Sequence, residues 1–224
     1  MKTAMILAAG RGERLRPLTD VIPKALCRVQ NKPLIEYHVA KLAQCGFERL
    51  VINHAHLGGQ IRRYLGDGSR WNVEICYAPE PPGGLETGGG IYNALPLLGK
   101  EPFLTVNADI ITDYNFNALR LSPDVMVKLV LVANPAHNHG GDFGLCQQHL
   151  SNEKAYTFAG IACYRPEAFY NCQAGRYSVI PIVRHFADEN LASGELYEGL
   201  WLDIGSPERL RLANTLAHLR GGGA

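Results

Sequence analysis

Two glycines and four cations lie in one loop directly after the first apolar run, in the segment LAAGRGERLRPLTDVIPKAL (7–26). The residues concerned are Gly10, Gly12, Arg11, Arg14, Arg16 and Lys24. Glycines let backbone N–H groups approach an anion closely, and arginine and lysine side chains bind phosphate oxygens. The loop therefore predicts a polyphosphate site. An exposed basic loop without a ligand is the simpler alternative.

Two common phosphate-binding motifs do not fit this loop. A dinucleotide fingerprint needs a third glycine where Leu15 stands, and it must lead directly into a helix, which Pro17 prevents. The P-loop pattern with its Gly-Lys-Ser/Thr ending is also absent from the segment. These mismatches argue against a hydride-transferring enzyme and against a P-loop phosphate site.

A second glycine-rich segment, PEPPGGLETGGGI (79–91), is predicted to hold a base and a ribose, because backbone atoms can approach a ligand there. The alternative is a helix N-terminus with Thr87 as its N-cap and with closely packed glycines. Glu86 bears on the choice of base. A carboxylate suits the paired N–H donors of guanine, whereas uracil offers a single imide N–H.

Two aspartates, Asp109 and Asp203, each follow an apolar run. A lone aspartate in such a place is commonly a turn former or a helix cap. Two carboxylates together suit Mg²⁺, which takes the rest of its ligands from water and substrate phosphates. The histidine pairs His54/His56 and His137/His139 lack a cysteine or aspartate at ligand spacing, so we expect hydrogen-bonding or surface roles and no zinc site.

Alternating strands and helices must position these residues. We expect strands at 3–8, 47–53, 73–78, 102–109, 127–133 and 156–164, and helices at 33–46, 57–64, 87–98, 180–190 and 207–219. The alternation predicts one α/β domain (1–220) with a mainly parallel, mixed sheet covered by helices on both faces, followed by a glycine-rich tail (221–224). Ligands of such sheets bind beyond the carboxyl ends of the strands.

Composition narrows the class of protein. The chain has 224 residues, is 46% apolar and carries a net charge of +1, which argues against binding to nucleic acid or to a membrane surface. No apolar run approaches the ~18 residues of a membrane span. The six cysteines show no C-x-x-C spacing, so we expect reduced thiols in a cytoplasmic protein, and we expect a monomer.

The pattern G-x-G-x-R-L-x-P-L-T-x-x-x-P-K-x-L, complete at 10–26, resembles the sugar-1-phosphate nucleotidyltransferases. The resemblance implies a Rossmann-like nucleotidyltransferase fold and a nucleoside triphosphate and a sugar-1-phosphate as substrates, with Mg²⁺ on Asp109 and Asp203. It assigns catalysis to Arg14, on the nucleotide phosphates, and to Lys24, on the charge at the reacting phosphorus. It places the nucleotide against Ala8, Ala9, Gly10, Gly12, Glu13, Arg14, Glu86, Thr87, Gly88 and Asn107.

Shorter segments are similar, in order, to one branch of the family: INHAHLG, LETGGGI, NPAHNHGGDF, TFAGI and SGELYEGLWLDIG. This branch joins UTP to N-acetylmuramate α-1-phosphate in bacterial cell-wall sugar recycling, and the resemblance implies the same reaction here. A mannose-1-phosphate guanylyltransferase is the alternative that Glu86 keeps open. A non-catalytic nucleotide-sugar-binding regulatory protein also stays open.

The sequence departs from the family in three places. Ala108 stands where a glycine usually precedes the first metal-binding aspartate, and its methyl group is expected to crowd the nucleotide slightly. The E-K-P motif that contacts the sugar phosphate is absent, and Ser178 stands where this branch tends to have a lysine. We therefore predict a sugar-phosphate site built from Asp142, Lys154, Gly160 and Arg176.

Overall fold

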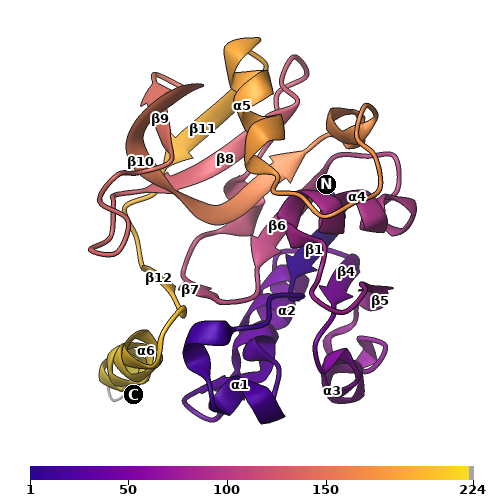
Figure 1. Cartoon of the computed structure of the whole chain (residues 1–224), viewed down its shortest axis with the longest axis vertical. Helices are drawn as coiled ribbons and strands as arrows, with labels where there is room; N and C mark the ends of the chain where they lie inside the picture. Colours follow the sequence, from indigo (N-terminus) through magenta and orange to yellow (C-terminus); the bar gives the residue numbers. More distant parts are fainter. Residues whose placement is uncertain (222–224) are drawn as a thin grey trace.

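A twisted sheet of eight strands runs through the computed structural model, which describes residues 1–221 (Figure 1). The strand order is β11-β8-β10-β6-β1-β4-β5, with β9 beside β10. The strands are β1 (Thr3–Leu7), β4 (Arg49–His54), β5 (Glu74–Pro79), β6 (Phe103–Asn107), β8 (Val127–Val132), β9 (Phe143–Cys146), β10 (His149–Tyr164) and β11 (Ala192–Leu196). The neighbours β6, β1, β4 and β5 are parallel, whereas β10 is antiparallel to β6, β8, β9 and β11.

Helices cover both faces of this sheet. One face packs against α2 (Leu34–Gln44) and α3 (Gly58–Leu65), and the other against α4 (Glu86–Leu98) and α5 (Ile180–Asp188). The residues of β1 divide accordingly, since Ile6 packs on the α2 side and Met5 on the α4 side, both fully buried. The predicted α/β fold with a mixed sheet between two helical layers is therefore confirmed.

The structure also contains the short helix α1 (Leu18–Val21), the longer helix α6 (Pro207–Gly221) and the short strands β2 (Arg28–Val29), β3 (Lys32–Pro33), β7 (Ile110–Thr112) and β12 (Trp201–Asp203). Single 3₁₀ turns occur at η1 (Glu13–Leu15), η2 (Lys24–Leu26), η3 (Ser69–Trp71), η4 (Phe116–Ala118) and η5 (Pro166–Phe169). The predicted glycine-rich tail lies outside the described residues, except for Gly221, the last residue of α6.

A third, small apolar cluster joins the opening loop to the last helix. Leu15 packs there with Ile204 and Ala213, all at most 3% exposed. In Figure 1, α6 and β12 accordingly lie to one side of the main sheet, next to the first helical segments. The cluster brings the opening loop and α6 to the same edge of the molecule.

The sheet differs from the expected one in the length of β10. The apolar run 156–164 predicted only its second half, because the residues of 149–155 are mostly polar. Those residues pair with β9 and make one contact with β11 at the margin of the sheet, where polar side chains reach water. The edge strand β11, with the sequence ASGEL, carries too few apolar residues to be recognised.

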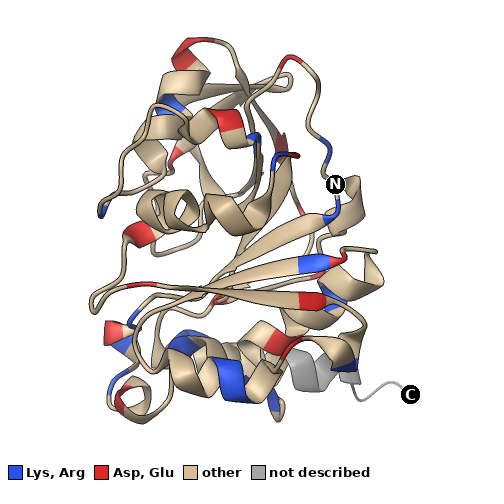
Figure 2. Cartoon of the chain, turned by 90° about the vertical axis from the view of Figure 1, so that its right-hand side faces the viewer, with Lys and Arg blue, Asp and Glu red and all other residues tan. Residues whose placement is uncertain are grey.

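Charged residues of both signs are interspersed on the face of the molecule in Figure 2, in keeping with the small net charge. Among residues 1–221, no helix is long and apolar enough to cross a membrane. Two of the six cysteines, Cys27 and Cys163, are buried, as expected for small apolar side chains, whereas Cys146 is exposed.

Candidate active site

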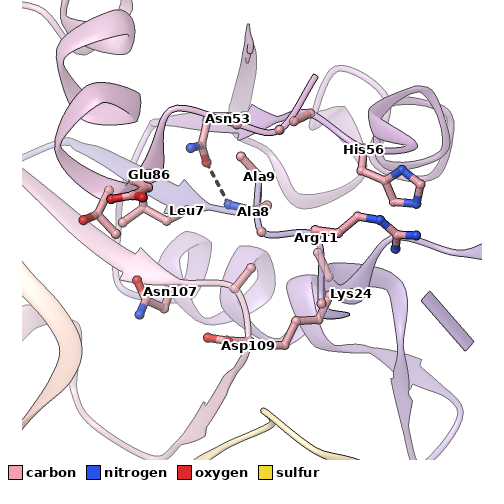
Figure 3. Close-up of a pocket in the computed structure, with 18 of the residues that line it drawn as sticks. Leu7, Ala8, Ala9, Arg11, Lys24, Asn53, His56, Glu86, Asn107 and Asp109 are labelled. Carbon is pink, nitrogen blue, oxygen red and sulfur yellow. Dashed lines mark hydrogen bonds and ion pairs between the residues drawn. The ribbon is translucent and has the colours of Figure 1, made fainter. Parts of the chain in front are cut away.

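A cavity of about 590 Å³ opens beyond the carboxyl ends of β1, β4 and β6 (Figure 3). The following residues line it: Leu7–Glu13, Lys24, Ala25, Asn53, Ala55, His56, Gly83, Gly84, Glu86, Thr87, Asn107–Asp109 and Arg176. Both glycine-rich loops thus meet at one hollow, at the edge of the sheet where ligands of α/β proteins bind.

The opening loop is folded around the buried side chain of Thr19. The Thr19 hydroxyl donates to the carbonyl of Gly12 (2.8 Å), and Nη1 of Arg11 donates to the carbonyl of Thr19 (2.6 Å). Gly12 has φ +72°, and a Cβ there would lie 2.9 Å from Cγ2 of Thr19 and 3.1 Å from Cβ of Lys24. Only glycine combines this backbone conformation with so close an approach, so Gly12 lets Lys24 reach the cavity.

Lys24 and Asp109 meet inside the cavity, and the ammonium group donates a hydrogen bond to Oδ2 of Asp109. The side chains are 14% and 30% exposed, so the pair is largely shielded from water. Figure 3 shows the two side chains pointing toward each other, with Ala8 and Asn53 across the hollow. An anionic ligand that enters here meets a cation whose charge is shared with one carboxylate.

Asp203 reaches the same edge through a short antiparallel pair. In the pair of β7 and β12, Asp203 lies opposite Ile110, and the N–H of Ile204 donates to the carbonyl of Asp109 (2.7 Å). The backbones of Asp109 and Asp203, far apart in the sequence, therefore run side by side. Three-residue strands are too short to predict, so the sequence could suggest that the acids are neighbours but could not show how.

The two carboxylates suit a hard divalent cation. Carboxylate oxygens are its preferred protein ligands, and Mg²⁺ typically takes one or two of them and completes its shell with water and substrate phosphates. No cluster of three or more metal-ligating side chains occurs among the described residues. The two carboxylates thus fit Mg²⁺ brought in with a phosphate substrate.

Asn53 joins the two loops, although sequence reasoning did not single it out. Its Oδ1 accepts from the N–H of Ala8 (2.7 Å), and its Nδ2 donates to Oε1 of Glu80 (2.7 Å). Oε2 of Glu80 in turn accepts from the N–H of Leu85 (2.7 Å). A polar residue at the end of a buried strand was the available signal.

The triple glycine of α4 serves close packing. The N–H groups of Gly88 and Gly89 donate to the carbonyl of Tyr177 (2.9 and 3.1 Å). A Cβ on Gly88 would lie 2.6 Å from the Tyr177 ring, and one on Gly89 would overlap the carbonyl of Gly175. The first turn of α4 is therefore occupied by the segment 175–178, and Gly88, a predicted nucleotide contact, is buried and does not line the cavity.

The interpretation of Thr87 as an N-cap is wrong. The N-cap position belongs to Leu85, and the Thr87 hydroxyl, one residue inside the helix, accepts from the N–H of Val179 (2.9 Å). The hydroxyl therefore binds the segment 175–179 and does not cap the N–H groups of α4. Glu86 has φ +60° and projects to the cavity mouth, where its Oε1 pairs with Nε of Arg176 (3.3 Å).

The structure brings most of the predicted site residues together. Those that line the cavity are Ala8, Ala9, Gly10, Gly12, Glu13, Lys24, Glu86, Thr87, Asn107, Asp109 and Arg176. Those outside its lining are Arg14, Gly88, Asp142, Lys154, Gly160 and Asp203. Ala108, whose methyl group was expected to crowd the nucleotide, lines the cavity but is only 3% exposed and packs in the core.

Asp142 is engaged within its own loop. Its Oδ2 accepts from the N–H of Phe158 (2.9 Å) and from Nδ2 of Asn138 (3.2 Å). These bonds tie the segment 134–142 to β10 and use one of the two carboxylate oxygens. A sugar hydroxyl would therefore have to bind the other oxygen.

Gly160 and Lys154 lie on β10 but differ in their relation to the cavity. Gly160 has φ +72°, and a Cβ there would lie 2.5 Å from Nδ2 of Asn107, so the missing side chain makes room for Asn107 at the cavity wall. Lys154 is exposed, and its side chain has no hydrogen bond or ion pair within residues 1–221.

A buried histidine supports the strand that carries Asp109. Nε2 of His38 donates to the carbonyl of Ile110 (2.9 Å), and burial lowers the pKa of His38 from 6.5 to about 4. The neutral ring therefore holds β7 at ordinary pH. Of the four histidines noted in the sequence, His56 bonds the carbonyl of Thr19 (3.0 Å) and His137 contacts Asp203 (3.1 Å), as expected. His54, in contrast, is the buried last residue of β4.

Comparisons with known proteins agree with this geometry. The profile of the family described as "Nucleotidyl transferase" matches residues 3–160. An N-acetylmuramate α-1-phosphate uridylyltransferase of Neisseria meningitidis is 49% identical over 96% of this chain and 97% of its own length. A protein of the same description from Caulobacter vibrioides is 30% identical over 92% of this chain and 93% of its own length.

Solved structures share the fold. A UDP-glucose pyrophosphorylase in complex with UDP-glucose superposes with a TM-score of 0.79 at 18% identity, covering 98% of this chain and 99% of that one. An inositol-1-phosphate CTP transferase from T. maritima gives a TM-score of 0.78 at 19% identity, covering 100% and 98%. The complete phosphate-binding motif, the fold and these matches together show that the chain belongs to the nucleotidyl transferase family, among the sugar-1-phosphate nucleotidyltransferases.

Proposed function

We propose that this enzyme joins UTP to N-acetylmuramate α-1-phosphate, releasing UDP-N-acetylmuramate and pyrophosphate, and that it serves the recycling of a cell-wall sugar. The observation that carries the proposal is the 49% identity with a relative of that activity along nearly the full length of both chains. The cavity supports it, because a cation and two glycine-rich loops face a carboxylate at one place.

The reaction requires alignment and charge neutralisation and no general base. A sugar-1-phosphate is largely dianionic near neutral pH, because its second pKa is ~6. One of its oxygens attacks the α-phosphorus of the nucleotide, the bond from that phosphorus to the bridging oxygen breaks, and pyrophosphate leaves with the electron pair. Positioning and electrostatic stabilisation are the main demands of such a transfer.

Lys24 is the cation best placed for this charge. Its ammonium group projects into the cavity beside Asp109 and stabilises the negative charge that builds at the reacting phosphorus. Asp109 and Asp203 would hold Mg²⁺, which, when bound, would neutralise phosphate oxygens. Arg14 would bind the pyrophosphate portion.

A residue at the mouth of the cavity keeps a second pair of substrates possible. Glu86 lies there, 47% exposed, and its carboxylate could accept the two N–H donors of guanine if it left Arg176. A mannose-1-phosphate guanylyltransferase is therefore the second candidate. In the free protein the Glu86 carboxylate is paired with the exposed guanidinium of Arg176, which guanine would have to displace.

A matrix of pyrophosphate release tests the proposal. UTP and GTP would each be combined with the 1-phosphates of glucose, mannose, N-acetylglucosamine and N-acetylmuramate, in the presence of Mg²⁺. We expect UTP with N-acetylmuramate α-1-phosphate to give the highest kcat/KM. A preference for GTP with mannose-1-phosphate would replace the proposal by its rival, and no release with any pair would favour a non-catalytic nucleotide-sugar-binding protein.

The proposal includes a cytoplasmic, monomeric enzyme. Its support is the substrate UTP together with six cysteines that lack C-x-x-C spacing. Size-exclusion chromatography with light scattering would test the monomer, which should elute near 24.6 kDa.

A further inference from the structure

The helix α6 brings a second arginine to the edge of the site. Its first turns are held there by the cluster in which Ile204 and Ala213 pack against Leu15 of the opening loop. Arg209 lies on this part of α6, and its side chain is only 14% exposed. Sequence reasoning treated 207–219 simply as an amphipathic helix and assigned this arginine no role.

Arg209 is paired with the predicted metal ligand Asp203. Its Nη1 lies 2.7 Å from the Asp203 carboxylate and 2.6 Å from Nε2 of His137. Asp203 and Asp109 therefore share one arrangement: each carboxylate is neutralised by a cation from another segment, Arg209 in one case and Lys24 in the other.

The guanidinium of Arg14 approaches the same point. A Cβ on Gly205 would overlap the guanidinium of Arg209 and would lie 2.8 Å from Nη2 of Arg14. Arg14 is exposed and its side chain forms no ion pair or hydrogen bond within residues 1–221. Two guanidinium groups thus converge beside Gly205 against one carboxylate, and this excess of positive charge suits an anion.

We propose that Arg209 is a second phosphate-binding cation, which pairs with Asp203 in the free protein and transfers to the pyrophosphate portion of the nucleotide when substrate binds. Phosphate oxygens compete with the Asp203 carboxylate for this guanidinium group, with or without a metal ion, and a carboxylate that turned toward Mg²⁺ would release it more easily. Arg209 and Arg14 would then bind the pyrophosphate from both sides of Gly205. The proposal rests on the nucleotidyl-transfer part of the proposed function and on neither the base nor the sugar.

Binding of inorganic pyrophosphate tests this role directly. Isothermal titration would compare the wild-type protein with Arg209→Gln, once with Mg²⁺ and once with EDTA. We expect the Kd for pyrophosphate to rise about 10-fold to 100-fold under both conditions, as for loss of a charge-assisted hydrogen bond. A rise confined to Mg²⁺ would overturn the proposal, because Arg209 would then act only by positioning Asp203.

The matched control is Arg211→Gln. Arg211 lies two residues further along α6, is 72% exposed and pairs only with Glu208 and the carbonyl of Pro207. The Arg211→Gln variant should bind pyrophosphate with the same Kd as the wild type. An equal loss in this variant would mean that any positive charge on α6 suffices, and it would remove the specific role of Arg209.

Arg209→Lys controls for a folding defect, because loss of the guanidinium group leaves the largely buried Asp203 carboxylate with the His137 ring as its remaining side-chain contact among the described residues. The lysine keeps the charge, so its Kd should lie between those of the wild type and Arg209→Gln. A lowered Tm with unchanged pyrophosphate affinity in both Arg209 variants would show a purely structural contact. Because pyrophosphate is the product with every base and sugar, these results do not depend on the substrate matrix.

Discussion

Lys24 donates a hydrogen bond to Asp109 across the cavity, although one residue begins η2 and the other follows β6. In the free protein the two side chains neutralise each other. In the proposed reaction Lys24 would bind a phosphate oxygen and Asp109 a divalent cation, so substrate binding would separate the pair. The following predictions test the parts of this exchange and the scaffold around it.

Lys24→Ala should lower kcat by about 100-fold or more while changing nucleotide affinity much less, because its charge matters most as negative charge builds at phosphorus. Steady-state kinetics and equilibrium binding of UTP separate the two effects. Lys100→Ala, at an exposed lysine outside the cavity lining, is the control and should be unchanged. If only KM rises in Lys24→Ala, Lys24 is an ordinary binding residue.

Asp109→Asn and Asp203→Asn should each abolish Mg²⁺-dependent turnover and leave the fold intact, because an amide is a neutral and weaker ligand for a hard cation. Activity would be measured against Mg²⁺ concentration, with circular dichroism as the check on folding. The exposed Asp124→Asn serves as control. Near-normal activity of both Asp109→Asn and Asp203→Asn would contradict the metal site.

Gly89→Ala should destabilise the protein by about 1–3 kcal/mol, the usual cost of overpacking, because the new methyl group overlaps the carbonyl of Gly175. The displaced segment carries Arg176, so the KM for the sugar phosphate should rise as well. Gly59→Ala in α3 is the control, since nothing lies within 4 Å of its Cβ position. Urea unfolding should show Gly59→Ala to be neutral or slightly stabilising.

His38 should make the protein less stable in mild acid. Burial, together with the positive charge of Lys41, lowers its pKa to about 4, against the raising effects of Asp109 and of the bond to Ile110. Between pH 6.5 and about 4 the unfolded chain binds a proton that the folded chain does not, so stability falls as the pH drops through this window.

The variant His38→Gln isolates this effect, because glutamine can still donate to the carbonyl of Ile110 and does not titrate. Urea unfolding would measure how much the free energy of unfolding falls between pH 7.5 and pH 5. We expect it to fall by about 2 kcal/mol less in His38→Gln than in the wild type. An equal loss in both proteins would mean that His38 is protonated in the fold or that other groups dominate.

The buried strands and the helices that cover them could be predicted because each has a clear pattern of apolar residues. Strand β1 is a continuous apolar run, and α2 has a single stripe with Ile35, Val39 and Leu42 buried. Elements held by their neighbours could not be predicted. Strand β11 is polar, and β7 and β12 have three residues each, so their pairing depends on the finished fold.

The loops of the site were predictable and its contacts were not. The motif placed Lys24 and Asp109 among the reacting groups, and the structure shows them in contact. Tyr177 packs on α4 because a segment distant in the sequence folds back against this helix, and no local sequence pattern predicts such a contact. The same holds for Arg209, whose significance comes from packing α6 against the opening loop.

The hydrogen bonds of Asn53 give the cavity an intrinsic width. Ala8, Asn53, Glu80 and Leu85 form one chain of hydrogen bonds between the opening loop and the loop before α4. The distance between the opening loop and the loop before α4 is thus set by the lengths of the Asn53 and Glu80 side chains. Shortening Glu80 by one methylene would narrow or tilt the slot, so discrimination between bases of different size can be changed at a residue that touches neither base nor phosphate.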